Sequence, residues 1–328
     1  DLNATVAMQM LWVEPGTFTM GSPITEAGRG TDEAEHNVTL TKGFYLGKYE
    51  VTQAQYEAVM TGNSNGLSVP PSQYSGNPNR PVEKVSWYDA QVFLTHLNDA
   101  EIAAGRLPAG WSYVLPTEAE WEYACRAGTT TAYSWGAAIA SSNANYSSSG
   151  ISQTTDVGQY AANPWGFFDM HGNVWEWVAD WNGAYPTGPV TDPSGATSGS
   201  YRILRGGGWD FDGKFLRSAE RNNIHPSGRY NTLGFRVGFK QTNEPPVFSN
   251  PPSVSVIENQ TLVLTVTASD PDGDSLTYSL AGGTDQGAFV LNSFNSSTGL
   301  LTFKNAPDFE ANASAAGNNA YFVTVQVT

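Results

Sequence analysis

The stretch at residues 171–177, HGNVWEW, is the feature that most constrains what this chain can fold into. Trp175 and Trp177 alternate with Glu176, which is the period of a β-strand whose two faces differ in character. Gly172 allows a left-handed or closely approached backbone just before this strand. The simplest interpretation is a tryptophan-rich core with a hydrogen-bonded carboxylate, so the sequence predicts a buried strand here.

A proline-rich break at residues 241–252, QTNEPPVFSNPP, divides the chain, because prolines there remove backbone donors and interrupt any strand or helix pattern. We therefore expect one domain over residues 1–240, a linker over 241–252 and a second domain over 253–328. The first domain mixes short strands, helices and long loops. The second shows the period-2 alternation of strands at residues 262–267 and 321–327.

Helix-capping patterns predict three helices in the first domain, at residues 53–60, 86–99 and 117–127. In each, a hydroxyl residue is followed three positions later by Gln, Asp or Glu, which is the capping-box spacing. The pairs are Thr52 with Gln55, Ser86 with Asp89, and Thr117 with Glu120. Cys125 shares a face of the third helix with Trp121, so its thiol is expected in the core. A strand, a turn and a second strand are predicted over residues 11–21.

The charge balance limits the partners of the chain. Its formal net charge is -15, from 31 acidic and 16 basic residues, which disfavours nucleic acid and anionic lipid and favours calcium. One cysteine excludes an internal disulfide framework. No apolar run approaches the roughly 20 residues that span a bilayer, so no direct membrane insertion is expected. We expect an exported protein whose signal is not present in this sequence.

Several short motifs follow one another in order across residues 11–239: MGS, YEVT, LPTEAEWEYACR, HGNVWEW and RGG. This set resembles the formylglycine-generating enzyme and sulfatase-modifying factor family. The resemblance implies an α+β fold class, with an irregular domain related to C-type lectins. Motifs over residues 254–328 resemble a cadherin-like repeat, which implies that an all-β Greek-key sandwich of seven strands follows.

The resemblance also implies calcium sites. Around HGNVWEW the family binds calcium through carboxylates, here Asp169 and Glu176, and through carbonyls, here Gly172 and Val174, a hard-oxygen shell. A second family site maps to Asn145 and the carbonyl of Tyr146, although its other half, near residues 152–156, does not align. In the cadherin-like repeat the implied ligands are Glu258, Asp270, Asp272, Asp274, Asp308 and Glu310. So many carboxylates at one end of a sandwich would repel without a cation, but a solvated acidic turn is the alternative.

Enzymes of this family make formylglycine with copper held by two thiolates that follow the GG segment. In this chain Gly206 and Gly207 are followed by GWDFDGKFLRSAER, which is shorter than the catalytic pattern and contains no cysteine. Oxygen ligands cannot replace such a soft dithiolate site, and Cys125 alone cannot form the pair. We expect no copper and no formylglycine synthesis. The four histidines show no metal-binding spacing, and no other catalytic motif stands out.

Aromatic and short polar side chains alternate over residues 209–231. The candidate ligand-binding residues are Trp209, Asp210, Phe211, Asp212, Phe215, Asn222, Asn223, His225, Tyr230 and Asn231. Aromatic anchors beside adaptable polar groups are typical of a binding surface for protein or glycan. The segment is also similar to the variable region of lectin-fold proteins that retroelements diversify. The alternative is that these loops only cover the tryptophan-rich core.

The sequence thus leads us to expect a non-catalytic, extracellular or cell-surface protein of bacterial origin. Its partners would be a protein or glycan ligand, or neighbouring copies in self-assembly, with Ca²⁺ as the bound ion. Two alternatives stay open. One is a structural subunit of an extracellular filament or surface layer, and the other is a divergent enzyme or maturation factor of the family.

Overall fold

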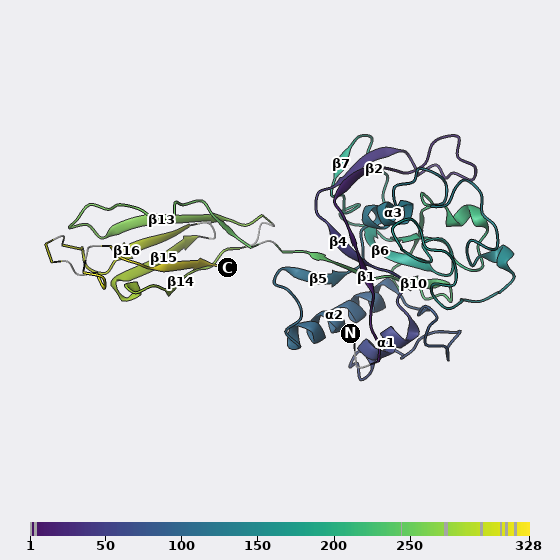
Figure 1. Ribbon diagram of the computed structural model, residues 1–328, viewed down its shortest axis with the longest axis horizontal. Coiled ribbons are helices and arrows are strands. Elements are labelled where there is room, and N and C mark those ends of the chain that lie inside the picture. The colour runs from purple at the N-terminus through teal and green to yellow at the C-terminus, as the bar shows by residue number, and fades with distance from the viewer. Residues whose placement is uncertain are drawn as a thin grey trace. The chain divides into compact units, whose positions relative to one another are not determined.

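A computed structural model describes residues 2, 5–243, 245–271, 275–295, 298–308, 310–311, 314–317 and 320–328. The chain forms two compact units, Asp1–Lys240 and Gln241–Thr328 (Figure 1). Within the residues so described, no helix has both the length and the apolar character needed to cross a membrane.

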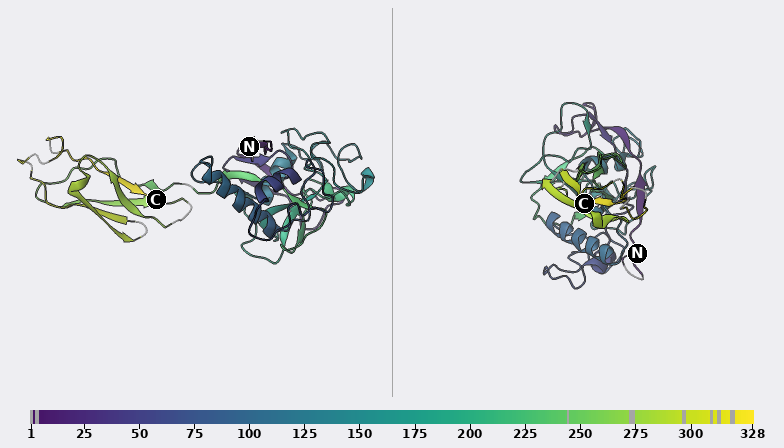
Figure 2. Two further views of the ribbon diagram at one scale, coloured as in Figure 1. Left: turned by 90° about the horizontal axis from the view of Figure 1, so that it is seen from below. Right: turned by 90° about the vertical axis from the view of Figure 1, so that its left-hand side faces the viewer.

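The three helices of the first unit begin at the predicted capping boxes. They are α1 (Gln53–Met60), α2 (Trp87–Ala103) and α3 (Glu118–Arg126), and each N-cap hydroxyl accepts a hydrogen bond from the backbone of its partner residue. Short 3-10 turns form η1 (Ser147–Ser149) and η2 (Gly213–Leu216). α2 continues past the predicted end at residue 99 because no glycine interrupts it before Gly105. α1 and α2 lie together along one side of the unit (Figures 1 and 2).

The described strands of the first unit form three small sheets, joined by long loops. One has the order β1 (Met10–Val13), β4 (Phe44–Gly47), β11 (Gly238–Gln241) and β5 (Trp111–Val114). The second has the order β10 (Leu233–Phe235), β6 (Trp175–Trp181), β8 (Arg202–Arg205) and β9 (Asn222–Ile224). The third has the order β2 (Gly16–Met20), β3 (His36–Leu40) and β7 (Val190–Thr191). The two strands predicted over residues 11–21 are present, but they join different sheets instead of pairing.

The predicted strand of HGNVWEW is β6, which lies inside the second sheet and is covered on both faces. Trp175, Glu176 and Trp177 are all buried, although their alternation predicted one apolar and one polar face. β8 ends at Arg205, because the following Gly206 and Gly207 have φ of 94° and 82°. The backbone here approaches its neighbours closely, since a Cβ on Gly207 would lie 2.6 Å from the Leu216 side chain.

The second unit is an antiparallel β-structure. One sheet has the order β12 (Val247–Phe248), β13 (Leu262–Ser269), β16 (Thr298–Phe303) and β15 (Phe289–Asn295), and β14 (Tyr278–Gly282) pairs with β17 (Thr324–Val327). A short turn, η3 (Gln286–Ala288), precedes β15. The strands predicted at residues 262–267 and 321–327 correspond to β13 and to β17, which is shorter. β12 falls inside the range expected to be linker, and its pairing with β13 makes it part of this unit.

Candidate binding surface and calcium sites

Four buried arginines hold the segment at residues 205–236, which contains all the candidate ligand-binding residues. Each makes an ion pair with a glutamate that is also buried, and no side chain among the eight is more than 4% exposed. The pairs are Arg205 with Glu122, Arg217 with Glu33, Arg221 with Glu118, and Arg236 with Glu176. The segment is therefore fixed at both ends and twice in its middle.

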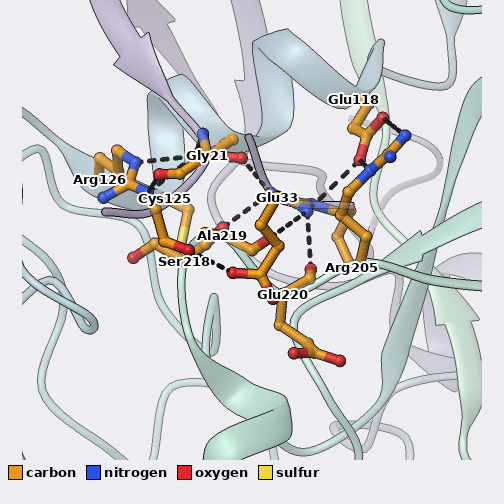
Figure 3. Close-up of polar contacts among 12 residues, drawn as sticks. Gly21, Glu33, Glu118, Cys125, Arg126, Arg205, Ser218, Ala219 and Glu220 are labelled. Carbon is orange, nitrogen blue, oxygen red and sulfur yellow. Dashed lines mark hydrogen bonds and ion pairs between the residues drawn. The ribbon is translucent and has the colours of Figure 1, made fainter. Parts of the chain in front are cut away.

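The contacts of Arg205 show how a buried arginine fixes the segment (Figure 3). Its guanidinium donates to the carbonyls of Ser218 at 2.7 Å, Ala219 at 3.1 Å and Glu220 at 2.7 Å. It also donates to the Glu122 carboxylate, which lies on α3. A buried ion pair offsets its desolvation only when further hydrogen bonds satisfy the remaining donors and acceptors, and four of the five N–H groups of Arg205 have acceptors here. This side chain thus joins the start of the segment to its middle.

The single cysteine lies in the same region, and its predicted place in the core is confirmed. Cys125 is 0% exposed, and its Sγ lies 3.6 Å from Nε2 of His171. Burial raises the pKa of Cys125 to about 12, so the thiol is protonated at neutral pH. After the GG segment, Phe211 and Phe215 occupy the region where thiolates were sought, with ring centroids 5.6 Å apart. The residues present do not fit a copper dithiolate site.

An aromatic surface forms where the start of the segment meets its end. The ring of Trp209 meets the ring of Tyr74 edge-on, with centroids 5.7 Å apart, and its Nε1 donates to the carbonyl of Asn231 at 3.0 Å. The Asn231 amide donates to the Tyr74 hydroxyl at 3.3 Å. Tyr230, next to Asn231, is 53% exposed. We call Tyr74, Trp209, Tyr230 and Asn231 the aromatic surface.

Sequence reasoning missed Tyr74, because it belongs to the loop between α1 and α2 and its surroundings, PPSQYSGNPN, are those of an ordinary turn-rich loop. A buried carboxyl group holds this loop in place. Glu83 is 0% exposed, its Oε1 accepts from the backbone N–H of Tyr74 at 2.7 Å, and its Oε2 has no hydrogen-bond partner among the described residues. Burial raises the pKa of Glu83 to about 7.

The other candidate ligand-binding residues lie in several places. Asp210 and Asp212 follow Trp209 and are exposed. Asn222 and Asn223 lie on β9, and His225 follows that strand directly. β9 and β10 form opposite edges of their sheet, so these three residues are separated from Asn231, which precedes β10.

Phe211 and Phe215 require a correction, because we expected both rings to face a ligand. Both are half-buried and pack against the core. The Phe211 ring meets Trp175 edge-on with centroids 5.3 Å apart. The two rings also meet each other edge-on, with centroids 5.6 Å apart, so they belong to the core packing beneath this part of the segment.

The first predicted calcium site lies in a cluster of buried acids. Arg236 binds both oxygens of Glu176, at 2.6 and 2.7 Å, and Asp169 accepts from the backbone N–H of Gly158 at 2.6 Å. Burial raises the pKa of Asp169 to about 6, and burial together with Asp169 raises the pKa of Glu50. The Glu50 oxygens accept from the Asn173 amide at 2.8 Å and from the Val174 N–H at 3.1 Å. Glu176 also accepts from Nε1 of Trp121 at 2.7 Å, so these carboxylates already have partners within the protein and this calcium site stays a prediction. Gly172 and Val174 lie in the buried turn between Asp169 and Glu176.

The second predicted calcium site has oxygen atoms that already accept hydrogen bonds. Asn145 Oδ1 accepts from the Ser149 hydroxyl at 2.9 Å, and the Asn145 carbonyl accepts from the Asn173 backbone at 2.9 Å. The carbonyl of Tyr146 accepts from the Ser149 N–H at 2.9 Å. Each of these oxygens already accepts a hydrogen bond from within the protein. The second calcium site therefore stays a prediction.

In the second unit the structure brings together three of the six predicted ligands. Glu258, Asp308 and Glu310 are exposed, and one carboxylate oxygen from each lies within 4.8 Å of the others. Asp270 is half-buried after β13, whereas Asp272 and Asp274 lie outside the described residues. A set of carboxylate oxygens this close has the chemistry that Ca²⁺ prefers.

Comparison with known proteins identifies both units. Residues 3–240 match the family model of the sulfatase-modifying factor enzyme 1-like domain, and residues 243–328 match that of a bacterial Ig domain. Serine/threonine-protein kinase pkn1 of Chlamydia caviae is 32% identical over 256 residues, which cover 70% of this chain and 37% of the kinase. The formylglycine-generating enzyme of Streptomyces coelicolor is 34% identical over 184 residues, which cover 50% of this chain and 54% of the enzyme. The structure of Treponema denticola variable protein 1 has a TM-score of 0.61 at 29% identity, covering 72% of this chain and 96% of that one.

The match to a bacterial Ig domain covers the part whose motifs resemble a cadherin-like repeat, and both groups share the β-sandwich architecture. This chain spans only 37% of the length of the chlamydial kinase and about half that of the bacterial enzyme. The family model, by contrast, covers nearly the whole first unit. The chain therefore belongs to the sulfatase-modifying factor enzyme 1-like domain family, with a bacterial Ig-like domain following the family domain.

Proposed function

We propose that this chain is a non-catalytic extracellular binding protein, whose first unit presents the aromatic surface to a protein or glycan and whose second unit binds calcium. One observation carries the proposal. The segment at residues 205–236 is fixed by four buried ion pairs, yet its loops leave Trp209 half-buried and Tyr230 and Asp210 exposed. The buried arginines that fix the segment and the exposed residues that would contact a ligand are thus different residues of the same segment.

A fixed frame favours binding because little conformational entropy remains to be lost. Trp209 is oriented by Asn231 and Tyr74, so its ring is already held in one place before a ligand arrives. Aromatic rings of this kind supply a large contact area at a low cost in entropy. The similar fold of a protein named variable protein 1 is consistent with this division, because exposed residues can be exchanged without disturbing the buried arginines.

The chemistry of the cysteine supports a role without catalysis. The family's copper site needs two thiolates, whereas this chain has one thiol, whose pKa burial raises to about 12. Phe211 and Phe215 fill the segment after the GG pair and pack against the core. The relatives include a formylglycine-generating enzyme, and it is this activity that we propose has been lost.

Binding to arrayed proteins and glycans tests the proposed surface. The full chain should bind at least one ligand class, and the double variant Trp209→Ala, Tyr230→Ala should lose at least about tenfold in affinity, since hot-spot aromatics contribute this much. Tyr201→Ala is the matched control, because Tyr201 is 48% exposed and lies outside the segment. Unchanged binding by the double variant would overturn the proposal.

Oxygen uptake separates the binding role from catalysis. With copper and a cysteine-containing sulfatase peptide, the chain should consume no more oxygen than a blank. Copper-dependent uptake would instead support a divergent enzyme. Regular filaments that form with rising concentration and dissolve on chelation of calcium would favour the structural subunit.

A further inference from the structure

The first unit contains a cavity that the segment at residues 205–236 borders through Arg221. Its volume is about 370 Å³, within the range of small-molecule sites. The walls come from β2 and β3, from the start of α3, from the end of β6, and from the loop at residues 183–196. None of the predicted site residues lines this cavity, and the proposed function uses only the Arg221–Glu118 ion pair in its wall.

Asp180 is the polar group that distinguishes this cavity. It is 3% exposed, and its Oδ2 accepts from the backbone N–H of Glu118 at 2.8 Å. Its Oδ1 has no hydrogen-bond partner, and the carboxylate makes no ion pair, among the residues that the structure describes. The cations whose charges act on Asp180 are used elsewhere, since Arg202 stacks on Trp181 and Lys240 pairs with Glu120. Asp180 is thus a buried carboxyl group that lacks a cationic partner.

The other polar groups of the cavity are either satisfied or also acceptors. Arg221 binds both oxygens of Glu118, and the Tyr185 hydroxyl donates to that same carboxylate at 3.1 Å. His36 is 7% exposed, and its Nδ1 lies 3.0 Å from the carbonyl of Ala34. Since that nitrogen must donate its proton to the carbonyl, Nε2 is the acceptor of the neutral ring. Asp180 and Nε2 of His36 are therefore two acceptors that a ligand with hydrogen-bond donors could use.

The remaining walls are apolar and aromatic. Trp181, Tyr185, Val190 and Pro193 line the cavity and are half-buried. We propose that this cavity binds a small organic amine, whose ammonium group pairs with Asp180 and donates to His36 while its apolar body lies against Trp181 and Tyr185. An ion pair inside a largely apolar site is what would give such a ligand both affinity and orientation.

This pairing makes binding depend on pH. Burial raises the pKa of Asp180 to about 7, and Glu118 adds to the effect, so the carboxyl group is largely neutral below that pH. The charged or titratable groups around Asp180 are Glu118, Glu120, Lys240 and Arg202, together with His36, Tyr185 and Arg221 in the same cavity. A bound ammonium group favours the charged carboxylate, so binding should release a proton near pH 7.

Titration calorimetry of the full chain with 2-phenylethylamine tests the proposal. At pH 8 the amine should bind at least about tenfold more tightly than its neutral analogue 2-phenylethanol, and more tightly than at pH 5.5. Near pH 7 the heat should vary with the ionisation enthalpy of the buffer, because a proton is released. Equal binding of amine and alcohol, or no binding of the amine, would overturn the proposal.

Two variants and a control locate the site. Asp180→Asn retains an oxygen that can accept from the Glu118 N–H but loses the charge, and it should weaken amine binding about tenfold or more. Asp99→Asn, on the exposed face of α2, makes the same change of charge and should have no effect. Ala196→Phe fills the cavity without altering Asp180 and should abolish binding, which keeps the test valid if Asp180→Asn folds poorly. Wild-type affinity in folded Ala196→Phe protein would place the amine elsewhere and contradict the proposal.

Discussion

The two units hold their negative charge in opposite ways. In the first, glutamates such as Glu122 and Glu176 are buried against arginines of the same unit. In the second, Glu258, Asp308 and Glu310 lie close together at the surface. Charge neutralised within a unit gives a rigid frame, whereas charge gathered at a surface leaves neutralisation to an ion from solvent. The first arrangement suits a fixed binding surface, and the second suits a module that calcium stiffens.

The largest effect is expected from removing a buried arginine. Arg205→Met should lower the free energy of unfolding by about 3–5 kcal/mol, because it leaves Glu122 buried and without this partner. All 10 tryptophans precede residue 240, so tryptophan fluorescence during denaturation reports on the first unit alone. A loss below about 1 kcal/mol, as for a surface pair, would mean that the ion pair does not fix the segment.

Removal of calcium should affect the second unit next most strongly. At a calcium concentration 100 times the Kd, binding stabilises the folded state by about 2.7 kcal/mol, so EDTA should lower its melting transition in calorimetry. In the presence of calcium, the second unit of the Glu310→Gln variant should melt at the temperature at which that of the parent chain melts in EDTA. If Asp169 binds calcium, EDTA should also lower the melting temperature of the first unit, measured by tryptophan fluorescence. Melting temperatures that do not change on addition of EDTA would overturn the calcium proposal.

The buried Glu83 predicts that the free energy of unfolding falls by about 3 kcal/mol as the pH rises. Its pKa of about 7 in the folded chain lies above the ordinary value of 4.5, so the folded state keeps a proton that the unfolded state has lost. The stability contributed by Glu83 is therefore complete below pH 4.5 and is lost as the pH rises to about 7. Glu83→Gln imitates the protonated form and should be more stable than the parent at pH 8 but not at pH 4.5. A constant difference across this range would show that Glu83 does not titrate as described.

The smallest effect is expected at an ion pair that is exposed on one side. Arg229 pairs with Asp89 at 2.6 Å, and its side chain is 47% exposed, whereas that of Asp89 is 7% exposed. Asp89 still accepts from the Ser86 N–H at 2.9 Å without Arg229, so Arg229→Ala should cost about 1 kcal/mol, less than Arg205→Met. A cost comparable to that of Arg205→Met would erase the distinction between buried and exposed pairs.

The sequence predicted what depends on local chemistry. Thr52, Ser86 and Thr117 marked the starts of all three helices of the first unit, because a capping box is contained within four residues. Strand pairing depends on distant segments, and no local pattern indicated that β1 and β2 would join different sheets. The cluster of Glu258 with Asp308 and Glu310 was indicated by the family motifs and not by spacing.

The site was harder to predict, because its parts meet only in the folded chain. Glu176 lies in HGNVWEW and Arg236 lies 60 residues further along the chain, and no local pattern indicates that they form one ion pair. Tyr74 lies in a loop of ordinary composition, and Asp180 follows the motif that drew attention to β6. The alternation that singled out Phe211 and Phe215 could not distinguish rings that face solvent from rings that face the core.

The most direct test of the account measures stability and ligand affinity on the same variants. In Trp209→Ala, Tyr230→Ala, affinity for the ligand found on the arrays should fall at least about tenfold while the buried arginine frame still unfolds cooperatively by tryptophan fluorescence. Arg229→Ala, which changes an exposed residue of the same segment outside the aromatic surface, should retain both properties. Full affinity in the double variant would contradict the claim that a rigid frame and a separate aromatic surface together make this a binding protein.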